Sequence, residues 1–302
     1  MYLTGSGKMF DLVSVGTHTY YIDFPSRIGI YKPDDTDAVY LIDSGNDTRI
    51  AKRVLKIINE RGWSLKAIFN THCHADHVGG NAYLQEHTGC SIYVPDIDCG
   101  AVGNPILNPV MLYGAYPTKE LTRKFYMAEK SEAKPLSQAQ LPEGLEWYPL
   151  CGHTMGMVGF KTVDNVWFIA DSIVSAEVLK KYTVTYLIDV EQYLSSLSYL
   201  ETLESGIFVP SHCEPTRDIK VLARLNKEYV GNIISEILEL CSEPRLCDDI
   251  IKHFFDNNKL GFNMMQYALI GSTVRSYLSY LKNAEKLIVV FNDNKVYWQT
   301  NS

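Results

Sequence analysis

The feature that most constrains the fold is a cluster of metal-competent side chains in residues 70–80, NTHCHADHVGG. His72, His74, Asp76 and His77 occupy only six positions. On an extended segment, side chains two residues apart point to the same side. Imidazole nitrogens and carboxylate oxygens suit zinc, iron or manganese. Four such groups exceed what one ion with an open position takes from a single loop, which indicates a second ion with ligands from elsewhere.

Three further ligand candidates occur later, each at the end of a predicted strand. His153 stands in the glycine-rich turn LCGHTMGM, Asp171 follows the apolar residues FIA, and His212 follows FVPS. Layered α/β proteins gather their sites at strand ends. We therefore expect these side chains to converge on the cluster, against the alternative of a polar loop with unrelated histidines.

The order of predicted elements indicates a layered α/β fold. Short segments rich in Val, Ile, Tyr and Phe, bounded by Gly, Pro or Asp, predict strands. These segments are residues 18–24, 27–33, 38–45, 65–72, 91–95, 145–150, 157–172 and 206–212. Helical spacing of apolar residues predicts helices between them. The predicted helices are residues 46–62, 81–89 and 189–206.

Two regions depart from this alternation. Residues 97–147 hold several prolines and mixed charge with little clean period, which favours an insertion, either a lid or a surface excursion. Past residue 216 the pattern is helical, with an interruption expected near Gly231, and it ends in a predicted hairpin. Helices followed by a terminal hairpin indicate a winged-helix-like domain. We therefore expect a catalytic domain over 1–215, with its insertion at about 97–147, and a smaller domain over 216–302.

Composition argues against several classes of protein. The net charge of −7 disfavours broad affinity for nucleic acid or anionic membranes. The chain shows no secretory signal and no apolar run near the roughly 20 residues of a membrane span. Its seven cysteines are odd in number and form no CxxC pair, which is typical of free thiols in a reducing compartment. We expect a cytoplasmic protein with no membrane partner.

The intact motif H-x-H-x-D-H and its three ordered partners resemble the metallo-β-lactamase superfamily over roughly residues 10–215. The resemblance implies an α/β fold of four layers, an αββα sandwich, with a dinuclear site at one edge. The implied ligands of the first ion are His72, His74 and His153. Those of the second ion are Asp76, His77 and His212, and Asp171 is implied to bridge the two ions. Asp43, in LIDSG, matches a position that orients a ligand histidine from behind.

Some residues depart from the family pattern. Ala170 stands where a glycine is common before the bridging aspartate, and Ser211 and Cys213 flank His212 where glycines are frequent. Neither change removes a ligand. Cys73 and Cys213 are the alternative, thiolate candidates, although Cys73 on an extended segment points away from the neighbouring histidines.

The implied chemistry is hydrolysis. Two divalent ions, with zinc favoured and iron or manganese as alternatives, would share a bridging hydroxide and polarise the substrate oxygen. Asp76 is expected to steer this nucleophile or to move a proton. We expect a dinuclear hydrolase that acts on a small ester, thioester or lactone. The candidates for aromatic walls of a substrate pocket are Tyr113, Tyr116, Phe125, Tyr182 and Tyr186.

The alternative is a phosphodiesterase or ribonuclease of the same superfamily, because some members with a winged-helix-like C-terminal domain cleave RNA. Residues 217–302, however, hold eleven Lys and Arg against ten Asp and Glu, which is no basic stripe. We therefore expect a small-molecule substrate rather than nucleic acid. The C-terminal domain is expected to dock on the catalytic domain or on a second copy of the chain, which leaves a homodimer open. Glyoxalase II, a thioesterase of this superfamily, ends instead in a helical glutathione-binding domain.

Overall fold

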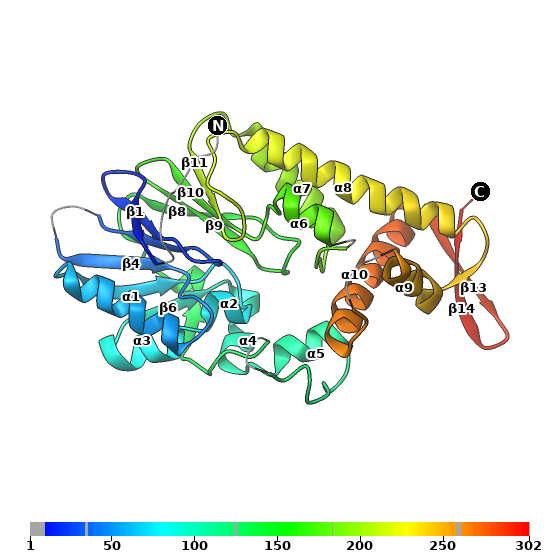
Figure 1. Cartoon of the computed structure of the whole chain (residues 1–302), viewed down its shortest axis with the longest axis horizontal. Helices are drawn as coiled ribbons and strands as arrows, with labels where there is room; N and C mark the ends of the chain where they lie inside the picture. The colour runs from blue at the N-terminus through cyan, green and yellow to red at the C-terminus, as the bar shows by residue number, and fades with distance from the viewer. Residues whose placement is uncertain (1–9, 34–35, 124–125, 183, 258–260, 302) are drawn as a thin grey trace.

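Two β-sheets packed face to face form the centre of the fold, and helices cover both outer surfaces (Figure 1). This is an αββα sandwich, as expected. The computed structural model describes residues 10–33, 36–123, 126–182, 184–257 and 261–301. Beyond the sandwich, the long helix α8 leads to a smaller group of helices and strands near the C-terminus (Figure 1).

The first sheet has seven strands in the order in which they occur along the chain. They are β1 (Leu12–Ser14), β2 (Thr19–Ile22), β3 (Ile28–Tyr31), β4 (Ala38–Ile42), β5 (Ser64–Phe69), β6 (Ser91–Val94) and β7 (Ala133–Pro135). Strands β1 to β4 pair antiparallel, and β4 to β7 pair parallel. The first two parallel crossovers, β4 to β5 and β5 to β6, use α1 (Thr48–Glu60), α2 (Ala75–Val78) and α3 (Asn81–Thr88). Asp47 caps α1 by accepting a hydrogen bond from the Ile50 amide at 2.9 Å.

The second sheet has four strands in the order β11-β10-β9-β8. They are β8 (Leu145–Pro149), β9 (Val158–Thr162), β10 (Val166–Ala170) and β11 (Ile207–Pro210). The parallel pair β10–β11 is connected through α6 (Ala176–Lys181) and α7 (Val190–Thr202). Each predicted ligand loop therefore follows a strand whose position the sheet fixes.

The aromatic core between the sheets holds the two layers together. Tyr21 and Phe69 from the first sheet pack with Phe160 and Phe168 from the second, and all four are buried. Gly29 permits this approach, because a Cβ there would lie 2.7 Å from the Phe168 ring. This packing fixes the position of one sheet relative to the other. It therefore also fixes the distances between the strand ends of the two sheets at one edge of the sandwich.

Residues 97–147, expected to form an insertion, contribute to the sandwich as well. The strand β7 within this segment adds to the first sheet. Described residues of this segment also form short helices that follow the turn η1 (Asp96–Asp98): α4 (Cys99–Gly103), α5 (Leu107–Tyr113) and η2 (Leu136–Gln138). The boundaries proposed from the sequence, 1–215, 97–147 and 216–302, stay predictions.

The described residues of the C-terminal unit, α8 to β14, form three helices and a small sheet. Its elements are α8 (Ile219–Leu240), β12 (Arg245–Leu246), α9 (Cys247–Asp256), α10 (Met264–Asn283), β13 (Leu287–Asn292) and β14 (Lys295–Thr300). The predicted hairpin is present, and both turn residues, Asp293 and Asn294, have positive φ, as a type I′ turn requires. The predicted interruption near Gly231 is wrong. Helix α8 runs through it, because buried neighbours such as Val230 and Ile233 outweigh the cost of about 1 kcal/mol for a helical glycine.

The C-terminal unit packs onto the segment before β7. Helix α10 lies against α5, and Leu112, Leu121 and Ala268 are buried together at this contact. Figure 1 shows the two helices meeting at the side of the molecule away from α1 and α3. No helix among the described residues is both long and apolar enough to cross a membrane.

Candidate metal centre

All seven predicted ligands lie together at one edge of the sandwich, in segments that follow strands. Residues 70–77 follow β5, and His153 lies between β8 and β9. Asp171 follows β10 and His212 follows β11. Their ligand atoms form three overlapping groups in which these atoms lie within 4.8 Å of one another. The groups are His72, His74 and His153; His72, His77 and Asp171; and Asp76, His77 and His212.

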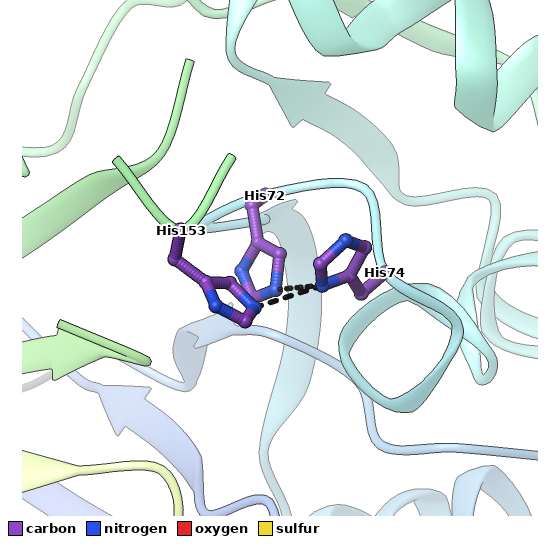
Figure 2. Close-up of side chains that lie close together, drawn as sticks. All are labelled: His72, His74 and His153. Atoms are coloured by element: carbon purple, nitrogen blue, oxygen red, sulfur yellow. Dashed lines mark hydrogen bonds between the residues drawn. The ribbon is translucent and has the colours of Figure 1, made fainter. Parts of the chain in front are cut away.

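Three histidines form the first cluster (Figure 2). The Nδ1 atom of His74 lies 3.1 Å from His72 Nε2 and 3.0 Å from His153 Nε2. Burial lowers the pKa of His74 to about 3, and it also lowers the pKa values of His72 and His153. Neutral imidazoles with nitrogens aimed at a common point are the donor set that a divalent cation requires.

Two carboxylates and two further histidines form the adjacent cluster. Asp171 lies between the rings: its Oδ1 is 3.2 Å from His77 Nε2, and its Oδ2 is 3.3 Å from both His153 Nε2 and His212 Nε2. Asp76 Oδ2 lies 3.2 Å from His212 Nε2. The Asp171 carboxylate therefore reaches both clusters, which is the place that the family resemblance implies for a bridging ligand.

The arrangement fits a cation because it leaves buried polar atoms without hydrogen bonds. His77 Nε2 and Asp171 Oδ1 are buried and lack a hydrogen-bond partner, although they lie 3.2 Å apart. Buried polar groups are otherwise almost always satisfied in folded proteins. A divalent ion between these atoms would complete their coordination. The assignment of the seven residues as ligands stays a prediction.

Electrostatics in the second cluster point the same way. Burial alone would raise the pKa of Asp171, but the adjacent His212 and His77 rings outweigh it and hold that pKa well below its usual range. The Asp171 carboxylate, in turn, raises the pKa of His212 to about 10. Without a cation, the carboxylates thus keep protons on the neighbouring imidazoles. A cation that binds here takes the place of those protons.

Asp43 supports the ligand loop from behind. Its buried carboxylate accepts hydrogen bonds from the Thr71 amide and the Thr71 hydroxyl, both at 2.8 Å. It also lies 2.8 Å from His77 Nδ1, which leaves Nε2 facing the cluster. Asp43 adopts a φ of 64°, and this left-handed turn after β4 directs the side chain into the loop. The contact agrees with the position implied for Asp43, whose role in metal binding stays a prediction.

Backbone oxygens orient two more of the rings. His153 Nδ1 lies 3.2 Å from the Tyr186 carbonyl, and His212 Nδ1 lies 2.9 Å from the Pro25 carbonyl. Each contact fixes the tautomer that leaves Nε2 free for a cation. No sequence pattern indicates these partners, because any residue can present a backbone carbonyl.

Ala170 stands where a glycine is common in the family, and its backbone conformation shows how alanine is accommodated there. It has a φ of 49°, in the left-handed region that glycine adopts without strain. The β10 ladder shifts register between Phe168 and Ala170, so the strand turns just before Asp171. Alanine therefore keeps the turn at a small conformational cost, and the aspartate still reaches the clusters.

Neither cysteine beside the ligands belongs to a metal-competent group within the described residues. The Cys73 thiol donates a hydrogen bond to Asn108 Oδ1 at 3.1 Å. Burial raises the pKa of Cys73 well above its usual range and that of Cys213 to about 11. Because neither thiol joins the groups of donor atoms, the geometry disfavours the thiolate alternative.

Two charged residues that the sequence did not single out tie ligand loops together. Asp98 Oδ2 lies 3.2 Å from the Cys73 amide and 3.4 Å from the Thr154 hydroxyl, so it links the loops of the first cluster. Arg27 donates to the Cys213 carbonyl and to Glu214 Oε1, which secures the loop of His212. Both contacts depend on segments far apart in sequence, where no local pattern reports them.

A cavity of about 570 Å³, which we call the chamber, opens onto the clusters. His74, Asp76, His153, Asp171 and His212 line its metal side. Further walls come from residues 24–26, from α5, from the segments 173–182 and 184–188, and from α10. The C-terminal unit therefore completes the cavity, a contribution that sequence reasoning missed.

The aromatic residues expected in the pocket divide into three groups. Tyr182 and Tyr186 line the chamber. Tyr113 lines a separate cavity between α5 and α10, and Tyr116 is 82% exposed, so neither belongs to the chamber. Phe125 lies outside the described residues.

Comparison with known sequences gives a family match and several relatives. The model of the Metallo-beta-lactamase superfamily matches residues 23–212. The probable metallo-hydrolase YybB of Bacillus subtilis is 26% identical over 218 residues, which cover 70% of this chain and 91% of that protein. The hydroxyacylglutathione hydrolase of Methylococcus capsulatus is 48% identical over 46 residues, 15% of this chain. This match and two similar ones span only 18%, 25% and 23% of those enzymes.

Comparison with solved structures shows the fold. A beta-lactamase domain protein from Burkholderia ambifaria superposes with a TM-score of 0.75 at 17% identity, covering 99% of this chain and 96% of that one. A metallo-beta-lactamase family protein from Thermus thermophilus gives a TM-score of 0.68 at 16% identity, covering 97% and 98%. The likeness therefore includes the C-terminal unit as well as the sandwich.

Proposed function

Because the chain belongs to the metallo-β-lactamase superfamily, we propose that it is a dinuclear metal-dependent hydrolase that acts on a small ester, thioester or lactone. The observation that carries the proposal is the pair of adjacent donor clusters that share Asp171 and open onto the chamber. The fold and the clusters support a metal-dependent hydrolase. The substrate, the number of ions and their identity belong to the proposal.

The two clusters would hold one ion each. The first would be bound by His72, His74 and His153, the second by the other cluster, with Asp171 between them. Two divalent cations, which we propose to be zinc, would make hydroxide available at neutral pH and stabilise charge developing on the substrate oxygen. Imidazole and carboxylate donors without a thiolate suit this assignment.

Asp76 is the residue that we propose to handle the proton. Its Oδ2 lies 3.2 Å from His212 Nε2 and accepts a hydrogen bond from the Ser26 hydroxyl at 3.4 Å. Asp76 also lines the chamber, so its carboxylate is accessible to a substrate there. A group in this position can orient the attacking water and carry its proton toward the leaving group.

We propose that the C-terminal unit is winged-helix-like. We also propose that it forms a wall of the substrate site and is not a nucleic-acid-binding domain. Its order of helices followed by a hairpin supports the first part of this proposal. The contribution of Gln266 and Leu269 to the chamber supports the second. Cleavage of phosphodiesters is less favoured, because no Lys or Arg is among the described residues that line the chamber.

A reporter screen tests the proposed function. Protein purified without chelators is analysed for metal and assayed against ester, thioester and lactone reporters, with bis-nitrophenyl phosphate and RNA in parallel. We expect two ions per chain and hydrolysis of at least one carbonyl reporter, lost on chelation and restored by zinc. His153→Ala should abolish activity and reduce metal content, whereas His87→Ala, at a histidine that contacts the Tyr83 carbonyl of its own helix, should change neither. Preference for RNA or the phosphodiester over every carbonyl reporter would refute the assignment.

A further inference from the structure

The chamber has features that define a substrate class more narrowly than the metal clusters do. Its volume of about 570 Å³ lies within the range of cavities that hold small ligands. Three separate elements supply apolar side chains to its walls. Met111 and Leu112 come from α5, Val174 and Val178 from the region of α6, and Leu269 from α10.

Apart from histidines, the charged side chains in the described lining of the chamber are all carboxylates. Apart from the proposed ligands, Asp98 is the charged residue among its described lining, and it is 4% exposed. No Lys or Arg belongs to that lining. A negatively charged substrate group placed against the walls away from the metal clusters would be buried without a counter-charge from the described lining, which is strongly unfavourable.

An arginine in a neighbouring cavity already makes contacts with other residues. Arg27 lines a second cavity, which shares the His212 wall with the chamber. Its guanidinium donates to the Cys213 carbonyl and to Glu214, and it lies 3.3 Å from Asp23. It is therefore neutralised by neighbouring acids and is not placed to receive a substrate anion in the chamber.

From this placement we propose that the chamber binds an uncharged, apolar acyl chain, with the scissile carbonyl at the metal clusters. The substrate is then a medium-chain acyl ester, thioester or lactone whose acyl portion bears no anionic group. This inference rests on the proposed function for the reaction and on the chamber for the chain. Hydrolysis adds water across the acyl bond, so an ester or thioester gives a carboxylic acid and the released alcohol or thiol, and a lactone opens to a single hydroxy acid.

The first test is a chain-length series of nitrophenyl esters from acetyl to dodecanoyl. We expect kcat/KM to rise by about fourfold per methylene until the chamber is filled, and then to fall. A suberic acid monoester, which ends in a carboxylate, should react about a hundredfold more slowly than the octanoyl ester. A flat profile from acetyl to octanoyl, or equal rates for the two eight-carbon esters, would overturn the proposal.

A pair of matched variants tests whether the chamber sets the preferred acyl-chain length. Val174→Phe fills part of the chamber and should move the optimum to a shorter chain. Val221→Phe makes the same change on α8, at a side chain that is 58% exposed, and should leave the profile unchanged. If both variants shift the optimum, or if neither does, the chamber is not the acyl site.

Binding of 1-octanol separates this inference from the proposed function, because the alcohol has no bond to hydrolyse. Calorimetry on the protein as purified should show binding with a negative heat-capacity change, weakened at least tenfold by Val174→Phe and unchanged by Val221→Phe. If octanol binds in this way while no carbonyl reporter is hydrolysed, the proposed function fails and the chamber assignment holds. If esters are hydrolysed but octanol does not bind, the chamber assignment fails.

Discussion

Asp43→Asn removes a charge behind the metal clusters while keeping the shape of the side chain. In the native protein, the Asp43 carboxylate accepts hydrogen bonds from the Thr71 amide and hydroxyl and lies 2.8 Å from His77 Nδ1. An asparagine oxygen can keep the bond to the Thr71 amide, but its NH₂ group then faces His77 Nδ1. That contact favours the tautomer with the proton on His77 Nε2, and a protonated nitrogen cannot bind a cation.

The expected loss is largest for the second ion. Replacing such a supporting partner lowers metal affinity about 10- to 100-fold, or about 1.4 to 2.7 kcal/mol. The first ion should be less affected, because Asp43 reaches His72 only through the Thr71 hydroxyl, which lies 3.0 Å from His72 Nδ1. Loss of charge-assisted hydrogen bonds should also lower the free energy of unfolding by about 2 to 4 kcal/mol.

The assay is zinc titration against a competing chelator, combined with metal analysis and denaturant unfolding. Asp164→Asn is the matched control: Asp164 accepts hydrogen bonds from the His18 amide at 2.8 Å and from the Thr19 hydroxyl at 2.7 Å, outside the metal clusters. It should lose stability and keep both zinc affinities. If Asp43→Asn binds the second ion as tightly as the native protein, or if both variants lose affinity equally, the tautomer argument is wrong.

Three further predictions concern the proton, the pH dependence and the C-terminal unit. Asp76→Asn should lower kcat about 100- to 10,000-fold in samples shown by metal analysis to retain two ions; full activity in such samples would exclude a role in moving the proton. Asp171 raises the pKa of His212 to about 10 in the absence of metal. The charged pair therefore stabilises the metal-free protein fully below the ordinary histidine pKa, and this stabilisation is lost as the pH rises through about 10. Zinc binding at pH 8 should accordingly release protons, which calorimetry in buffers of different ionisation enthalpy counts, and zero release would contradict the pairing. Thr273→Val should lower the free energy of unfolding by about 1 to 3 kcal/mol in denaturant unfolding. The reason is that the buried Thr273 hydroxyl on α10 accepts a hydrogen bond from the Leu187 amide at 3.3 Å. An unchanged free energy of unfolding would show that this hydrogen bond is not formed.

The positions of the seven candidate ligands could be predicted because each follows a strand that its own sequence signals. The strand that ends at Phe69 closes with the apolar residues 67–69, and the histidine motif starts three residues later. Strand ends in a layered fold meet at a common edge, so local patterns were sufficient to place these loops together.

The supporting contacts could not be predicted in the same way. The Pro25 and Tyr186 carbonyls orient ligand rings through the backbone, which the identity of the residue does not report. Asp98 bonds to the Cys73 amide across 25 positions, and only the folded chain brings the two together. The continuity of α8 through Gly231 likewise depends on tertiary packing, which outweighs local helix propensity.

The wall that α10 adds to the chamber separates two tasks within one chain. The candidate ligands lie on loops of the sandwich, whereas Leu269 lies on a helix that begins about fifty residues after the last of them. Substitutions along that face of α10 can reshape the cavity without touching an imidazole or a carboxylate of the clusters. Selection for a new acyl group could therefore act on the C-terminal helix while the reaction chemistry is inherited unchanged.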